Sequence, residues 1–183
     1  MKKTFATSLA ILASFGLSAA ANALTITEEP GSNLVSFSYT VDEATRTINL
    51  YEVWGANTSV VLLKFEGFDY SRSSWVINKY ATNETGADWT AFSHELLGST
   101  KGGSPDDDGL SFAQFGVPDR PRSSDSFSTV TADEVASRDY LNFTDGEVLN
   151  GAESFFTYGL TARRDEQAVN PFYLRQMAAE IGV

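Results

Sequence analysis

Apolar and polar residues alternate along most of this chain, and a period of two is typical of β-strands with one buried face. Residues 34–41 show the alternation clearly, with an apolar side chain at every second position from Val35 to Val41. Residues 46–54 repeat it and place on one face Ile48, Leu50, Glu52 and Trp54. Residues 59–65 form a short apolar run that suits a central strand. We expect these three segments to form an antiparallel meander.

Strand patterns continue towards the carboxyl end, separated by turn-forming segments rich in Gly, Pro, Ser and Asp. Further strands are expected at residues 74–80, 89–97, 110–115, 126–131, 140–143, 154–160 and 172–174. Helix signals are weak and predict only a turn or two at residues 132–138 and one turn at 177–181. About ten short strands with turns between them favour an all-β fold, an antiparallel β-sandwich or jelly roll.

The amino-terminal segment differs from the rest and has the three parts of a secretory signal. Two lysines are followed by an apolar stretch at residues 5–17, and small residues then lead to Ala23, the expected cleavage position. The apolar stretch is shorter than the roughly 20 residues that span a bilayer. We therefore expect a signal peptide at residues 1–23, a single β-sandwich domain at 24–183 and a soluble protein that is secreted or periplasmic.

The acidic composition limits the partners that this protein can have. The chain carries 13 basic and 24 acidic residues, and loss of Lys2 and Lys3 with the signal would change its net charge from −11 to −13. A charge of this sign repels nucleic acid and anionic membrane surfaces, so we expect neither as a partner. The chain contains no cysteine, which excludes thiol catalysis and thiolate metal sites.

No arrangement of residues predicts a catalytic centre. His94, the single histidine, stands on an expected strand, and the G-x-S-x-G turn of a serine nucleophile is absent. We therefore interpret His94 as a surface or hydrogen-bonded structural residue. Carboxylate pairs are numerous among the 24 acidic residues, yet none is distinguished by its context.

Asp106, Asp107 and Asp108 form the most suggestive polar segment. They lie in a Gly/Ser/Pro/Asp-rich loop at residues 98–108, and their carboxylates are the oxygen ligands that Ca²⁺ prefers. Adjacent side chains cannot all point at one ion, and an Asp-Gly pair also forms ordinary turns. The loop is therefore a candidate calcium site, with a solvated turn as the alternative.

Trp54, Trp75 and Trp89 are the candidate ligand-binding residues. Together with three tyrosines they could form a platform on which sugar rings stack: Tyr51, Tyr70 and Tyr80. The alternative is that the tryptophans fill the core of the sandwich, because large aromatic side chains bury much apolar area there.

Four stretches of the chain carry a family resemblance. They are NKYATNETGADWTAFSHEL at residues 78–96, DGLSFAQ at 108–114, LNFTDGEVLNGAESFFTYGL at 141–160 and NPFYLRQ at 170–176. They resemble exported bacterial proteins of the exosortase-sorted (PEP-CTERM) type. The resemblance implies a β-sandwich ectodomain at the cell surface or in the extracellular matrix, with no shared catalytic residues. Those proteins end in a Pro-Glu-Pro sorting tail, which this chain lacks, so we expect a released protein.

The sequence thus predicts a secreted, non-enzymatic β-sandwich of the extracellular matrix, biofilm or cell surface. A calcium-assisted carbohydrate-binding module, with polysaccharide as its partner, is the first alternative. A jelly-roll glycoside hydrolase is the second alternative.

Overall fold

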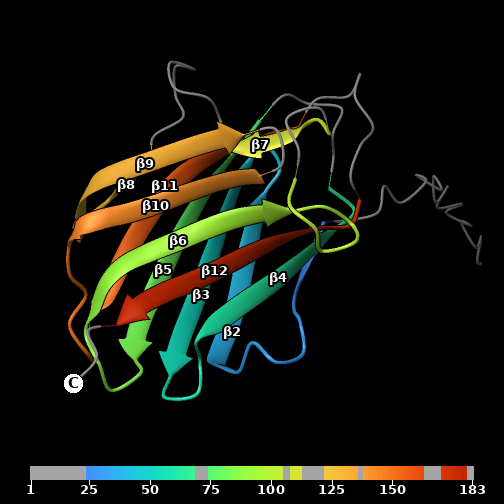
Figure 1. Ribbon diagram of the computed structural model, residues 1–183. Coiled ribbons are helices and arrows are strands. Elements are labelled where there is room, and N and C mark those ends of the chain that lie inside the picture. Colours follow the sequence, from blue (N-terminus) through green and yellow to red (C-terminus); the bar gives the residue numbers. More distant parts are fainter. Residues whose placement is uncertain are drawn as a thin grey trace, which may run out of the picture.

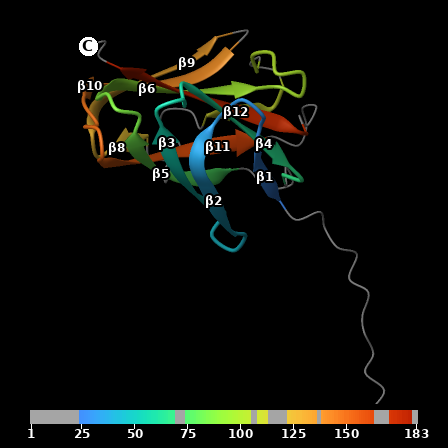
Figure 2. The ribbon, with the colours of Figure 1, turned by 90° about the horizontal axis from the view of Figure 1, so that it is seen from below.

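The computed structural model describes residues 24–68, 74–104, 108–112, 122–135, 138–162 and 170–180. These residues form two β-sheets packed face to face (Figure 1, Figure 2), which confirms the predicted all-β sandwich. The strands of this part of the chain are β1 (Thr25–Glu28), β2 (Leu34–Asp42), β3 (Thr47–Gly55), β4 (Val60–Glu66), β5 (Trp75–Glu84), β6 (Trp89–Leu97), β7 (Leu110–Phe112), β8 (Ser123–Ser124), β9 (Phe127–Val135), β10 (Arg138–Gly146), β11 (Glu153–Ala162) and β12 (Phe172–Glu180). None of the described segments is a helix long and apolar enough to cross a membrane.

The two sheets have six strands each within the described residues. Sheet A has the order β1-β4-β12-β6-β10-β9, and sheet B has the order β2-β3-β5-β11-β7, with β8 also paired to β11. In Figure 1 sheet A lies in front of sheet B. β3 and β5 run parallel, from Thr47 opposite Val76 to Gly55 opposite Glu84, whereas the other strand pairs are antiparallel.

The predicted meander is wrong in its third strand. β2 and β3 pair antiparallel as expected, but β4 belongs to sheet A, between β1 and β12. The chain changes sheets at a turn in which the Thr58 amide donates to the Gly55 carbonyl at 2.9 Å. The periodicity of a strand does not specify which sheet the strand joins, because its apolar face is buried equally well in either.

Both predicted helical turns are strands instead. Residues 132–135 belong to β9, and residues 177–180 belong to β12. β12 pairs with β4 on one side and with β6 on the other. Among the described residues, β9 pairs with β10 alone, and residues 178–180 pair with β6 alone. The hydrogen bonds to these neighbouring strands outweigh the modest helix preference of the alanines in both segments.

β2 departs from the predicted alternation near its start. A β-bulge lies between Leu34 and Ser36, and Val35 is exposed rather than buried. Beyond the bulge, Phe37 and Tyr39 pack against the core as the pattern predicts.

The alternation along β3 and β5 decides which side chains face inward. In β5 every second side chain from Trp75 to Asn83 is buried, and Lys79 stands in the middle of this series. In β3 the inner face has the predicted composition: Ile48, Leu50, Glu52 and Trp54. The intervening side chains, Tyr51 and Tyr80 among them, lie on the outer face of sheet B.

Candidate functional site

The three candidate tryptophans lie in the core. Trp54 and Trp89 are 0% exposed and Trp75 is 2% exposed. Trp54 packs edge-on against Trp89, with ring centroids 5.4 Å apart, and Phe68 packs against Trp75 at 5.4 Å. This burial corrects the expectation of an exposed tryptophan platform, because a ring without a solvent-exposed face cannot stack on a sugar. The three tryptophans fill the core of the sandwich, as the alternative interpretation predicts.

Of the three aspartates in the acidic loop, the structure describes Asp108, whereas Asp106 and Asp107 lie outside the described residues. Asp108 accepts hydrogen bonds from the Ser104 hydroxyl at 2.7 Å and from the Leu110 amide at 2.9 Å, which are contacts of a tight turn. In the part of the chain that the structure describes, no group of three or more acidic or histidine side chains is placed to hold a metal ion. The calcium site stays a prediction.

His94 is buried in the core, which corrects its interpretation as a surface or hydrogen-bonded residue. Its exposed fraction is 0%, and neither ring nitrogen has a hydrogen-bond partner among the described residues. Aromatic rings surround it at centroid distances of 4.8–5.6 Å: Phe92, Phe143, Phe156 and Tyr158. Burial first, and the charge of Lys79 second, lower the pKa of His94 well below its ordinary value, so the ring is uncharged at neutral pH.

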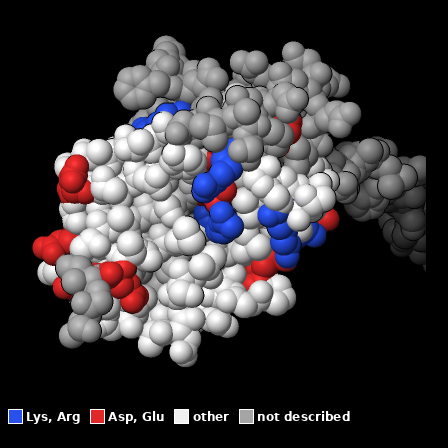
Figure 3. All heavy atoms as spheres, viewed as in Figure 1, with Lys and Arg blue, Asp and Glu red and all other residues white. Residues whose placement is uncertain are grey.

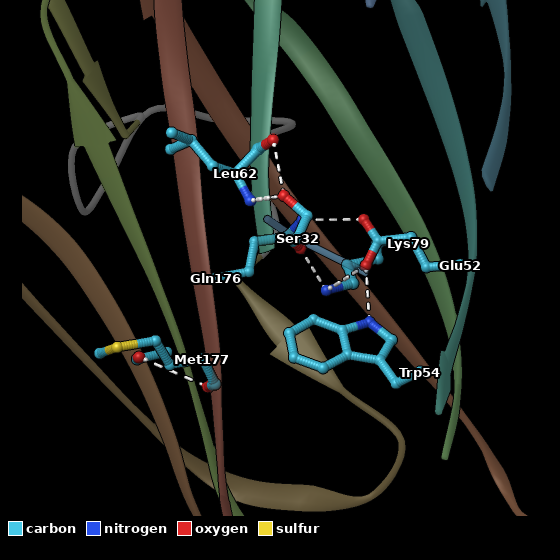
Figure 4. Close-up of polar contacts among 8 residues, drawn as sticks. Ser32, Glu52, Trp54, Leu62, Lys79, Gln176 and Met177 are labelled. Atoms are coloured by element: carbon cyan, nitrogen blue, oxygen red, sulfur yellow. Dashed lines mark hydrogen bonds and ion pairs between the residues drawn. The ribbon is translucent and has the colours of Figure 1, made fainter. Parts of the chain in front are cut away.

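A lysine, a glutamate and a glutamine meet in the core between the two sheets (Figure 4). Glu52 of β3 and Lys79 of β5 point inward from sheet B, and Gln176 of β12 points inward from sheet A. Lys79 Nζ lies 3.1 Å from Glu52 Oε2, and both side chains are fully buried. We refer to Glu52, Lys79 and Gln176 as the core triad.

Hydrogen bonds connect every member of the core triad. Lys79 Nζ donates to Gln176 Oε1, and Gln176 Nε2 donates to Glu52 Oε1 at 2.8 Å. Trp54 Nε1 donates to Glu52 Oε2 at 2.8 Å. The carboxylate therefore contacts the amine through one oxygen and the amide nitrogen through the other.

Aromatic rings surround the lysine of the core triad. Lys79 Nζ lies 3.9 Å from the ring centroid of Phe92, and it lies 5.2 Å and 5.6 Å from those of Trp54 and Phe156. Burial lowers the pKa of Lys79 to about 8, although the charge of Glu52 acts in the opposite direction. The amine in this solvent-shielded site therefore gives up its proton more readily than an exposed lysine does.

Tyr51, Tyr80 and Phe155 form an aromatic row on the outer face of sheet B. They stand opposite one another on three adjacent strands, β3, β5 and β11. The Tyr51 and Tyr80 rings are stacked, with centroids 5.1 Å apart and planes inclined by 9°, and the Tyr80 and Phe155 centroids are 5.0 Å apart. Because Tyr51 is 42% exposed, the row is open to solvent.

A polar ladder runs beside the aromatic row, two residues along each strand. Its members are cross-strand neighbours on β2, β3, β5 and β11: Thr40, Asn49, Asn78 and Thr157. Asn49 donates to the Thr40 hydroxyl at 3.0 Å, Asn78 donates to Asn49 Oδ1 at 3.1 Å, and Thr157 donates to Asn78 Oδ1 at 3.0 Å. Each asparagine amide has a second N–H group, so the ladder retains donors for a ligand.

The outer face of sheet A has a different character. Glu95 is paired there with Arg138 at 2.8 Å and with Arg175. Figure 3 shows basic side chains near the middle of this face. The aromatic row and the polar ladder of sheet B contain no charged residue.

Two surface hollows in the described part of the chain lack the carboxylate pair that a glycoside hydrolase needs. The first lies beside the turn between β3 and β4 and is lined by Ala56, Asn57, Thr58, Ser59, Ala178 and Glu180. The second is lined by Arg122, Ser128, Val130, Thr131 and Ala132. Glu180 is the one acidic residue of these two linings, so neither hollow offers two facing carboxylates.

Sequence reasoning placed Tyr51 and Tyr80 in one platform with the tryptophans, and the structure brings these two tyrosines together without them. Tyr70 lies outside the described residues. The signal that separates the two groups is the alternation itself, because Tyr51 is out of phase with Trp54 on β3. The same signal places Lys79 in phase with its buried neighbours on β5.

Comparison of the chain with models of known protein families gives no match, and comparison with curated proteins gives none either. The resemblance to exosortase-sorted proteins therefore stays a prediction.

Proposed function

We propose that this chain is an exported, non-enzymatic β-sandwich of the extracellular matrix, biofilm or cell surface, and that it binds a polysaccharide through the outer face of sheet B. The aromatic row of Tyr51, Tyr80 and Phe155 carries this proposal. Aromatic ring faces pack well against the apolar faces of pyranose rings. The adjacent polar ladder supplies the amides of Asn49 and Asn78 and the hydroxyl of Thr40 for the hydroxyls of the same sugar units, whereas Thr157 is buried and supports Asn78.

The charge and shape of this surface favour a neutral, extended polymer. The chain has a net charge of −11, which repels acidic polysaccharides, and neither row of the surface contributes a charge of its own. Both rows cross several strands of an open sheet, whereas small molecules are usually enclosed in a pocket. A neutral polysaccharide chain lying across the strands meets both rows at once.

Replacement of Tyr51 by alanine is expected to weaken polysaccharide binding about tenfold, a loss of about 1.4 kcal/mol. The variant removes the most exposed ring of the row while leaving the core intact. A glycan array identifies the preferred sugar, and depletion isotherms on microcrystalline cellulose and insoluble chitin give the affinity. Parallel isotherms in calcium and in chelator test whether the loop of Asp106, Asp107 and Asp108 assists binding.

Met177→Ala is the matched control, because Met177 is 40% exposed but lies in sheet A. This variant is expected to bind as the wild-type protein does. The proposal fails if Tyr51→Ala and Met177→Ala bind equally well, or if the wild-type protein binds neither the array nor the two polymers.

Export is tested by amino-terminal sequencing of the protein recovered from the periplasm or the medium of an expressing bacterium. We expect Leu24 as the first residue, since cleavage follows Ala23 in the Ala-x-Ala pattern. Recovery only from the cytosol, with Met1 or Lys2 at the amino terminus, would contradict export.

A further inference from the structure

The core triad places an amine, an acyl group and a proton carrier in mutual contact. The Lys79 amine contacts the side-chain amide of Gln176, and the Glu52 carboxylate contacts both of them. A buried ion pair needs only the lysine and the glutamate. The glutamine adds a carbonyl carbon beside the amine, and the proposed function, which uses the outer face of sheet B, does not account for it.

We propose that Lys79 and Gln176 join in an intramolecular isopeptide bond, with Glu52 carrying the proton. The lone pair of Lys79 Nζ attacks Gln176 Cδ and forms a new C–N bond. The bond between Cδ and Nε2 breaks, and Nε2 leaves as ammonia. One proton moves from Nζ to Nε2, so a primary amine and a primary amide become a secondary amide and ammonia, without any oxidant or reductant.

The two oxygens of Glu52 stand at the two ends of this proton transfer. Oε2 lies 3.1 Å from Nζ, where the attacking amine must lose a proton, and Oε1 lies 2.8 Å from Nε2, where the leaving group must gain one. A carboxylate in that position acts first as general base and then as general acid. Trp54 Nε1 donates to Oε2 at 2.8 Å and holds the carboxylate in this orientation.

The surroundings of the core triad favour the reaction. Attack requires an uncharged amine, and burial lowers the pKa of Lys79 to about 8. Because both groups are held in contact by the fold, the amine meets the amide at a high effective concentration. Full burial of all three side chains keeps water from competing for the acyl carbon.

The bond links the two layers of the sandwich covalently. Lys79 lies in β5 of sheet B and Gln176 lies in β12 of sheet A, 97 positions further along the chain. The chain has no cysteine, so a disulfide cannot make this link. β3 and β5 carry Glu52 and Lys79 on their inner faces and Tyr51 and Tyr80 on their outer faces. The link therefore anchors β5, the middle strand of the aromatic row, to sheet A.

The mass of the intact, denatured wild-type protein tests the proposal. After incubation near pH 9 we expect the measured mass to be lower, by one ammonia or about 17 Da, than the mass calculated from the amino-acid sequence of the purified chain. The variants Lys79→Met and Glu52→Gln are expected to keep the full mass of their own sequences. Lys64→Met, which changes a lysine of an exposed ion pair, is the matched control and is expected to show the loss. The full mass in the wild-type protein would overturn the proposal.

Tryptic peptides locate the bond. The segment that follows Arg72 is expected to stay uncut at Lys79 and to be joined to the peptide that begins at Gln176. Ring closure at Asn150, which precedes Gly151, also releases ammonia but joins no peptides, and that result would overturn the proposal. Loss of one water, about 18 Da, would assign an amide between Lys79 and Glu52 and would also overturn it. The wild-type measurement decides the matter even where a variant fails to fold.

Discussion

Replacement of Glu52 by alanine is expected to lower the free energy of unfolding by about 3–5 kcal/mol. The Glu52 and Lys79 side chains are both fully buried and 3.1 Å apart. Without the carboxylate the proposed link to Gln176 does not form, so the lysine ammonium is left in an aromatic core with no negative partner among its described contacts, and Trp54 Nε1 loses its acceptor. The cost of an uncompensated buried charge exceeds the cost of the lost contacts alone.

Urea denaturation followed by the fluorescence of the buried tryptophans measures this effect. Glu66→Ala is the matched control, because Glu66 forms an ion pair with Lys64 at 2.9 Å while its side chain is 58% exposed. That variant is expected to lose less than about 1 kcal/mol, since solvent screens an exposed pair. Equal losses in the two variants would contradict the presence of an uncompensated buried charge at Lys79 in the Glu52→Ala variant.

The double variant Lys79→Met with Glu52→Leu separates the charge from the rest of the core triad. It removes both ions and leaves no buried charge unpaired, so it is expected to be more stable than Glu52→Ala. The difference in the free energy of unfolding between the wild-type protein and the double variant measures what the linked core triad adds to stability. A double variant less stable than Glu52→Ala would contradict this account.

Acidification is expected to destabilise the protein through His94. The pKa of His94 in the folded protein lies well below 6.5, because burial opposes protonation and the charge of Lys79, before it is linked to Gln176, adds to the effect. Below pH 6.5 the unfolded chain therefore binds more protons at this residue than the folded chain does. The contribution of the uncharged His94 to the free energy of unfolding is fully present above pH 6.5. It is lost as the pH falls, by about 1.4 kcal/mol per pH unit down to the pKa of His94 in the folded protein.

His94→Leu isolates this contribution. Leucine fills the space among the surrounding rings without a titrating group, so the variant is expected to lose less stability than the wild-type protein as the pH falls from 6.5 to 5. At pH 7.5 the two proteins are expected to differ little, because the imidazole makes no hydrogen bond among the described residues. Urea denaturation at several pH values measures the difference. Parallel pH profiles would show that His94 does not contribute.

The sequence by itself determined the strands and the face on which most side chains lie. The segment 89–97 is β6 at its predicted bounds, and segments 34–41 and 46–54 match β2 and β3 within one residue. A period of two with aromatic and β-branched residues gives a strand one apolar face, so the local pattern alone is sufficient to locate these strands along the chain. The alternation puts Glu52 on the same face of its strand as Ile48, Leu50 and Trp54, and the structure shows that this face is buried. The same pattern at β5 places Lys79 inward.

Only the tertiary structure decided which strands are neighbours. Tyr51 and Tyr80 are stacked because β3 and β5 pair in parallel, although β4 lies between them in sequence. Gln176 meets Lys79 because β12 joins sheet A and faces β5 across the core, and it precedes by one residue the segment in which the sequence predicts a helical turn. Periodicity specifies the buried face of a strand but not its partner, its sheet or its direction, since these depend on contacts between distant parts of the chain.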